Sequence, residues 1–173
     1  MNWFIIVLIL LAIFGSMMWM MPSPRQRAQA ILRQKAMRSG FQVQITRILL
    51  PRALGEALAD ERDCVAYRIP RLNSTKKSSG ARASNVLVPW QIFRLQSHAN
   101  EGLPSDWSWS KGEGQLEPTA LTLIAELIET LPDDVYGLES TPVNASVYWE
   151  EHGTPEAVEL IQQQLTRLVD AAV

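Results

Sequence analysis

The residue types that most often carry catalysis or bind metal ions are scarce in this chain. It has two histidines, His98 and His152, and one cysteine, Cys64. Together they could supply three zinc ligands or a cysteine–histidine nucleophile pair. The histidines lie 54 residues apart, however, and no H-x-x-x-H or C-x-x-C spacing occurs. Cys64 lies in an alternating apolar stretch, which is typical of a small buried side chain. We therefore expect no metal ion, no cofactor and no catalytic residue.

A second candidate site is the acidic and aromatic cluster around residue 150. Tyr148 and Trp149 precede Glu150 and Glu151, an arrangement that a sugar-binding or hydrolytic site could use. Adjacent side chains of a strand point to opposite faces, so the two carboxylates should not converge on one substrate. We expect the solvated end of a strand here, and the alternative is a membrane-tethered enzyme that uses Glu150, Tyr148 or His152. No phosphate-binding glycine loop or nucleophile elbow occurs.

The tryptophans indicate a possible contact surface for a partner. Trp90 and Trp149 lie in predicted strands, where we expect them to be core residues. Trp107 and Trp109 lie in the stretch 97–115, which we interpret as a loop. Because exposed aromatic side chains mark protein contacts, Trp107 and Trp109 are predicted to bind a protein partner.

The pattern of apolar residues predicts an α+β domain over residues 41–173. Alternation predicts strands over 41–46, 64–69, 85–95, 135–139 and 146–150, and a 3.6-residue period predicts helices over 118–131 and 155–171. The polar segment 71–84 is predicted to be an exposed, mobile hairpin loop. This order of elements favours a mainly antiparallel sheet of four or five strands with two covering helices.

Residues 1–21 are predicted to form a transmembrane helix. No charged side chain precedes Arg25, and Phe4 to Met21 are nearly all apolar, which gives roughly 27 Å of helix. Trp3 and Trp19 lie near its ends, as in a membrane anchor. A cleaved signal peptide is disfavoured because no basic residue precedes the apolar run and no small-x-small site follows it. A buried core helix is disfavoured because the segment has no polar face.

Charge is divided sharply between the two halves of the remaining chain. Residues 22–94 hold 14 basic and four acidic side chains, whereas residues 95–173 hold two basic and 14 acidic ones. A basic juxtamembrane helix is predicted over residues 22–40, and its cations are candidates for the membrane surface: Arg25, Arg27, Arg33, Lys35 and Arg38. They place the domain in the cytoplasm and the N-terminus outside. The alternatives are a nucleic-acid patch and mutual neutralisation of the two halves within one domain.

The first 40 or so residues carry a family resemblance. Met20-Met21-Pro22-Ser23-Pro24-Arg25-Gln26-Arg27, a basic helix and Gly40-Phe41-Gln42-Val43 resemble the start of the bacterial translocase accessory family YajC. The resemblance implies a bacterial inner-membrane protein with one N-terminal span, associated with the translocon. We therefore expect a non-enzymatic, membrane-anchored scaffold or assembly protein that binds a protein partner. The alternatives are a membrane-tethered enzyme and a module that binds anionic lipid or nucleic acid; the expected partners are the bilayer and a protein, with nucleic acid disfavoured.

Overall fold

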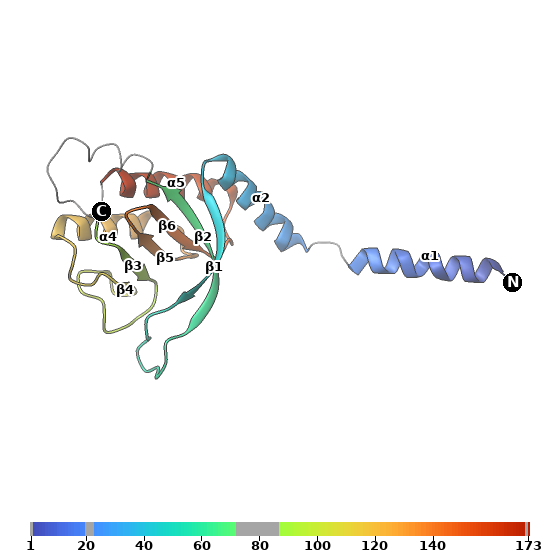
Figure 1. The fold of residues 1–173 in the computed structure, drawn as a ribbon, viewed down its shortest axis with the longest axis horizontal. Coiled ribbons are helices and arrows are strands. Elements are labelled where there is room, and N and C mark those ends of the chain that lie inside the picture. Colours follow the sequence, from blue (N-terminus) through green and yellow to red (C-terminus); the bar gives the residue numbers. More distant parts are fainter. Residues whose placement is uncertain (1, 20–22, 72–86, 172) are drawn as a thin grey trace.

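The computed structural model describes residues 2–19, 23–71, 87–171 and 173 of the 173-residue chain, without the side chains of residues 2 and 16–19. Residues 20–22 of the YajC-like junction lie outside the described part, and so does the predicted hairpin loop except for Arg71. The described helices and strands, shown in Figure 1, are α1 (Asn2–Trp19), α2 (Pro24–Arg38), β1 (Gln42–Leu49), β2 (Glu61–Pro70), β3 (Trp90–Phe93), β4 (Ser108–Lys111), α4 (Pro118–Thr130), β5 (Val135–Ser140), β6 (Asn144–Trp149) and α5 (Pro155–Asp170).

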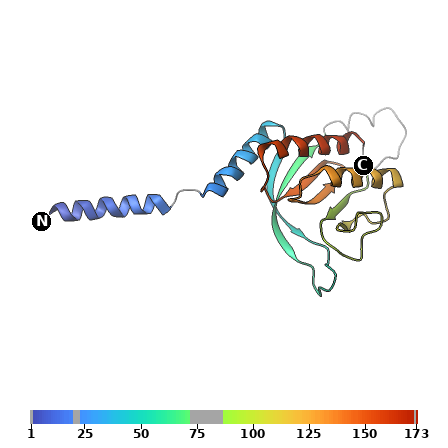
Figure 2. The same cartoon turned by 180° about the vertical axis from the view of Figure 1, so that it is seen from behind.

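The strands form one antiparallel sheet in the order β1-β2-β6-β5-β3-β4. Helices α2, α4 and α5 lie together over one face of it, as the two opposite views in Figures 1 and 2 show. The α+β class and the antiparallel pairing agree with the prediction, but six strands replace the expected four or five and a third helix joins the covering layer. The strand that was missed is β4, four residues long, within the predicted loop 97–115.

The predicted transmembrane segment is corrected by the structure. Helix α1 has 18 residues, Asn2–Trp19. Among the residues that the structure describes, no helix combines the length and the hydropathy of a membrane span. The prediction of a single-pass inner-membrane protein with a cytoplasmic domain therefore has no support from the structure.

Two groups of buried side chains stabilise the sheet, one on each face. The larger group lies between the sheet and the helices and includes Tyr67, Val147 and Trp149 from the strands and Ile124 and Ile161 from the helices. The smaller group contains strand residues only: Ile48, Cys64, Ala66, Phe93 and Tyr148. Because successive strand residues point to opposite faces, the smaller group lies on the face that the helices leave uncovered.

Gly137 is required on the uncovered face because two aromatic rings pack directly over it. A Cβ atom at Gly137 would lie 2.5 Å from the Phe93 ring and 2.9 Å from the Tyr148 ring. Both rings are buried and cannot move aside. We expect Gly137→Ala to lower the free energy of unfolding by about 1–3 kcal/mol, the usual cost of overpacking. Denaturant unfolding measures this change. In a Phe93→Leu protein, Gly137→Ala should lower the free energy of unfolding by less. An equal loss in the wild-type and Phe93→Leu proteins would contradict the packing explanation.

Candidate functional site

The uncovered face of the sheet contains a hollow of about 420 Å³. All six strands contribute to its lining, from β1 at one end of the sheet order to β4 at the other. The two edges of the sheet therefore border the same space, which means that the sheet curls around it. The lining residues are Thr46, Arg47, Ile48, Leu49, Arg68, Gln91, Ser110, Lys111, Glu139 and Tyr148.

A row of polar residues crosses the sheet at this hollow. Strand pairing places one residue of each strand opposite the next, in the order Gln42, Arg68, Ser146, Glu139, Gln91 and Lys111. Residues opposite each other on paired strands share a face, so these side chains belong to the uncovered face. The neighbouring row is apolar and includes Ala66, Tyr148 and Phe93. The hollow is therefore bordered by a polar row beside an apolar one.

A chain of hydrogen bonds joins two residues of the polar row to Tyr148 of the apolar row. The Gln91 amide donates to the Tyr148 hydroxyl at 3.1 Å, and that hydroxyl donates to a Glu139 carboxylate oxygen at 3.1 Å. Burial and the nearby Glu139 charge raise the pKa of the Tyr148 phenol above its ordinary value. The phenol thus stays protonated at neutral pH and serves as a fixed hydrogen-bonding group, rather than as an acid that gives up its proton to a substrate.

The cations of the hollow differ in whether they are paired. Arg47 binds Asp63 at 2.9 Å and also lies 3.7 Å from Glu61. Arg68 donates to the amide oxygen of Gln44 at 2.7 Å, and neither Arg68 nor Lys111 has a carboxylate partner among the described residues. The Arg68 Nε atom is buried without a hydrogen-bond partner in the described structure. Two cations of this face are therefore available to a ligand.

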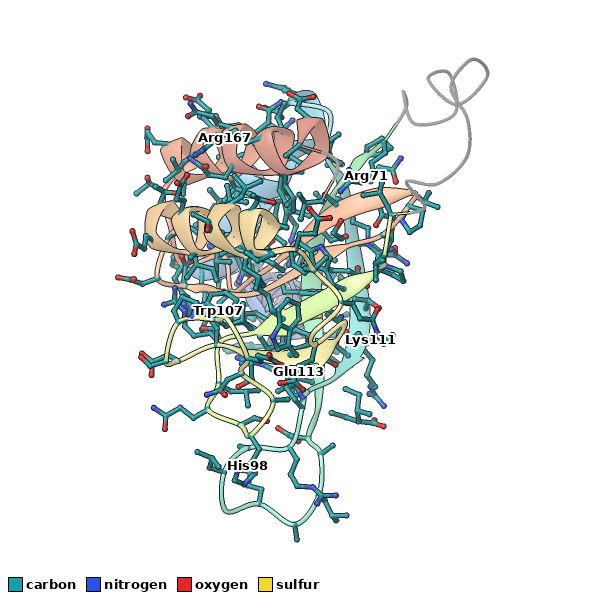
Figure 3. All side chains as sticks on the ribbon, turned by 90° about the vertical axis from the view of Figure 1, so that its left-hand side faces the viewer. Arg71, His98, Trp107, Lys111, Glu113 and Arg167 are labelled. Atoms are coloured by element: carbon teal, nitrogen blue, oxygen red, sulfur yellow. The ribbon has the colours of Figure 1, made fainter. Side chains whose placement is uncertain are left out.

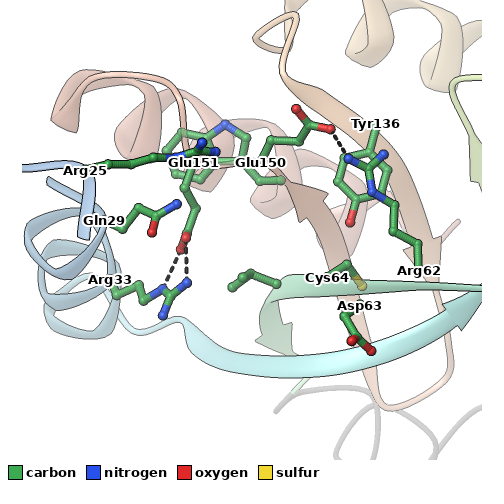
Figure 4. A pocket seen from close by; sticks show the side chains of 11 residues that line it. Arg25, Gln29, Arg33, Arg62, Asp63, Cys64, Tyr136, Glu150 and Glu151 are labelled. Carbon is green, nitrogen blue, oxygen red and sulfur yellow. Dashed lines mark hydrogen bonds and ion pairs between the residues drawn. The ribbon is translucent and has the colours of Figure 1, made fainter. Parts of the chain in front are cut away.

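A second, smaller pocket of about 220 Å³ lies between α2 and the strands (Figure 4). Both of its glutamates are paired: Arg33 binds Glu151 through two hydrogen bonds of 2.7 and 2.6 Å, and Arg62 binds Glu150, whereas Arg25 contacts the His152 ring. These pairs close the pocket and hold α2 on the domain. We therefore interpret this pocket as structural and the larger hollow as the candidate site.

Glu150 and Glu151 diverge, as predicted for adjacent strand-end residues. The expectation that both are solvated is wrong for Glu151, whose side chain is only 1% exposed. Besides Arg33, the Tyr67 hydroxyl donates to Glu151 at 2.6 Å. Glu151 also has a φ of 59°, in the left-handed region that is unusual for a residue other than glycine. This backbone turn carries the carboxylate to the helix-covered side, beneath α2.

The basic residues predicted to lie on a membrane surface belong to α2. Ser23 caps the N-terminus of this helix. Three of the five contact the folded domain: Arg33 binds Glu151, Lys35 lies 2.7 Å from Glu159, and Arg25 lies 2.7 Å from the His152 ring nitrogen. Arg27 and Arg38 are exposed, with no ion pair in the described structure. Among the described residues, four ion pairs join the basic half of the chain to the acidic half, which supports mutual neutralisation for those residues: Arg33–Glu151, Lys35–Glu159, Arg62–Glu150 and Arg94–Asp133.

The structure removes the reason for choosing Trp107 and Trp109 as partner contacts. Trp107 is 2% exposed and lies beneath the Arg94 guanidinium, at 5.4 Å. Trp109 is 3% exposed, lies in β4 rather than in a loop, and packs edge-on against Trp90. Both therefore contribute to the core, and their role in binding a partner stays a prediction without a structural basis.

The histidines and the cysteine are not brought together. Cys64 is buried on the uncovered face, where its thiol donates to the Thr46 carbonyl and burial raises its pKa. His98 lies in the β3–β4 connection (Figure 3), whereas His152 lies beside α2 and 3.4 Å from Glu150. Within the described part of the chain, no group of three potential ligands could hold a metal ion. An enzyme that uses Glu150, Tyr148 or His152 should gather at least two of these side chains in one pocket. No described pocket contains two of them.

The three tyrosines of the chain should make the protein sensitive to alkali. Burial, the leading cause, raises the pKa of Tyr67, Tyr136 and Tyr148 above the ordinary 10.0. Because the folded state disfavours the phenolates, the free energy of unfolding should fall as pH rises above about 10. Tyrosine absorbance at 295 nm should then change together with the far-ultraviolet circular dichroism. Ionisation of the tyrosines near pH 10 in a protein that stays folded would contradict this.

Comparison with known proteins gave no match to a family model, to a curated protein or to a solved structure. These findings leave the resemblance to YajC as an expectation from sequence.

Proposed function

We propose that this chain is a non-enzymatic binding protein and that the hollow on the uncovered sheet face binds a segment of a protein partner. The observation that supports this most is the pairing of the charges. Both glutamates in the pocket beside α2 bind arginines, whereas Arg68 and Lys111 in the hollow have no described carboxylate partner.

The size and the composition of the hollow also fit a binding role. A volume of about 420 Å³ falls within the range of ligand pockets and accommodates a few side chains of a bound segment. The polar row gives orientation through hydrogen bonds, while Ile48 and Leu49 add apolar contact. No histidine or cysteine lines the hollow, and Tyr148 is held protonated. These features favour recognition without covalent chemistry.

Site-specific photo-crosslinking in the full-length protein tests the proposal. Ser110 lines the hollow, and Ser110→p-benzoylphenylalanine should give an adduct of one defined protein in the cells that produce the chain. The matched control is the same substitution at Glu129, an exposed residue of α4 on the covered side. Thr46→Trp fills the hollow and should abolish the Ser110 adduct. An adduct that also forms from Glu129, or that survives Thr46→Trp, would reject the hollow as the binding site.

A further inference from the structure

We propose that the hollow is a carboxylate site, in which Arg68 and Lys111 bind acidic side chains of the partner segment. This inference rests on the proposed function and specifies the chemistry of the ligand. It follows from three features of the polar row: one guanidinium without a described carboxylate partner, the position of one lysine and the single acid between them.

Arg68 presents the side of its guanidinium that suits a carboxylate. Its Nη1 atom is engaged by Gln44, whereas its Nε atom is buried and has no hydrogen-bond partner in the described structure. Nε and Nη2 form one edge of the guanidinium, and two oxygens of a carboxylate bind such an edge with parallel hydrogen bonds. The Arg68 residue is half-buried, so a ligand carboxylate can approach the guanidinium, and a small shift of the side chain would give the Nε atom the acceptor that it lacks.

Lys111 completes the site from the opposite edge of the sheet. It is exposed at the end of β4, and Figure 3 shows it at the level of the strands, well apart from Arg167 of α5. Arg47, the third cation of the hollow, is held by Asp63 and Glu61 and is less available. Arg68 and Lys111 thus give two cations to an anionic ligand that approaches from the uncovered side.

Glu139 is the one acidic side chain among the described residues that line the hollow. It lies in the polar row between the two cations, two strands away from each, which is roughly 10 Å at the backbone. The lining without the paired Arg47 therefore holds two positive charges and one negative charge. This net positive charge attracts an anion, and the planar guanidinium of Arg68 matches the two oxygens of a carboxylate.

Binding of a labelled nine-residue peptide of alternating Ser and Glu to the full-length protein, followed by fluorescence anisotropy, tests this inference. We expect it to bind at least about tenfold more tightly than the matched Ser and Gln peptide, because charged hydrogen bonds are lost in the latter. Arg68→Met and Lys111→Met should each weaken binding several-fold. Arg38→Met, which removes an exposed cation of α2, should leave it unchanged. Glutarate should compete.

Two outcomes would overturn the carboxylate site: equal binding of the two peptides, or an equal effect of Arg38→Met and Arg68→Met. Saturation by glutarate with no binding of the Glu peptide would assign the site to free small acids and would reject a partner segment. Lys111 is exposed, so Lys111→Met remains informative if Arg68→Met fails to fold. A Ser110 adduct that persists in Arg68→Met would reject the carboxylate but keep the binding function, whereas the absence of any specific adduct would reject both.

Discussion

Arg33→Met should lower the free energy of unfolding by about 3 kcal/mol. The substitution leaves the Glu151 carboxylate, which is 1% exposed, without its two charged hydrogen bonds from Arg33. Breaking a buried ion pair from one side typically costs about 3–5 kcal/mol. We expect the lower end because the Arg33 side chain is 33% exposed and Tyr67 still donates to the carboxylate. Denaturant unfolding of the full-length protein measures the effect.

The control for this prediction lies on the same helix. Arg27 is exposed and has no ion pair in the described structure, so Arg27→Met should change stability by no more than about 0.5 kcal/mol. Glu151→Gln in the Arg33→Met background should recover part of the loss, since it removes the unpaired buried charge. If Arg33→Met costs no more than Arg27→Met, the ion pair does not hold α2 on the domain.

Trp149→Ala should cost about 3–5 kcal/mol, the usual range for removing a large buried aromatic side chain. Trp149 is 1% exposed and packs edge-on against Tyr67 at 5.3 Å between ring centroids. Its indole nitrogen donates to Asp134 at 2.5 Å, and the same carboxylate oxygen accepts the His152 backbone N–H at 2.9 Å. Trp149 therefore fixes the end of β6 from which Glu150 and Glu151 diverge.

Trp149→Phe separates the contribution of the aromatic ring to stability from that of the indole hydrogen bond. It retains an aromatic side chain, so it should lower the free energy of unfolding by less than Trp149→Ala does. In a double-mutant cycle, its effect and that of Asp134→Ala should not be additive. The coupling of charged hydrogen-bonded groups in contact is commonly about 0.5–3 kcal/mol. Additive effects of the two substitutions would show that the bond between Trp149 and Asp134 contributes nothing to stability.

The elements with strong local signals could be predicted from the sequence. The predicted helices 118–131 and 155–171 match α4 and α5 within one residue at each end, because broad apolar faces and prolines at their starts define them. Alternation located β1, β2, β5 and β6. The predicted 85–95 strand contains β3, although the described strand begins only at Trp90.

Features that depend on distant parts of the chain could not be predicted. β4 is a four-residue strand whose Ser-Trp-Ser-Lys sequence has little apolar content, so only pairing with β3 reveals it. Arg71, at the start of the predicted exposed loop, is 6% exposed and donates to Ser140 and to the Val169 and Val173 carbonyls.

The polar row was missed for a related reason. Arg68, Glu139 and Lys111 lie on separate strands, and their proximity follows only from the strand order and register. The one available signal in the sequence for this row was alternation, which places polar residues on one face of each strand and apolar residues on the other face. The buried Glu151 was missed because nothing in its neighbours Glu150 and His152 indicates a left-handed turn.

Hydrogen–deuterium exchange on the full-length protein, with and without the partner captured at Ser110, tests the central claim most directly. If the uncovered face binds the partner, amide exchange should slow in β1 and β4, the two edge strands that border the hollow, and stay unchanged in α4 and α5 on the covered face. Slower exchange confined to α4 and α5, with no change in those strands, would contradict the account.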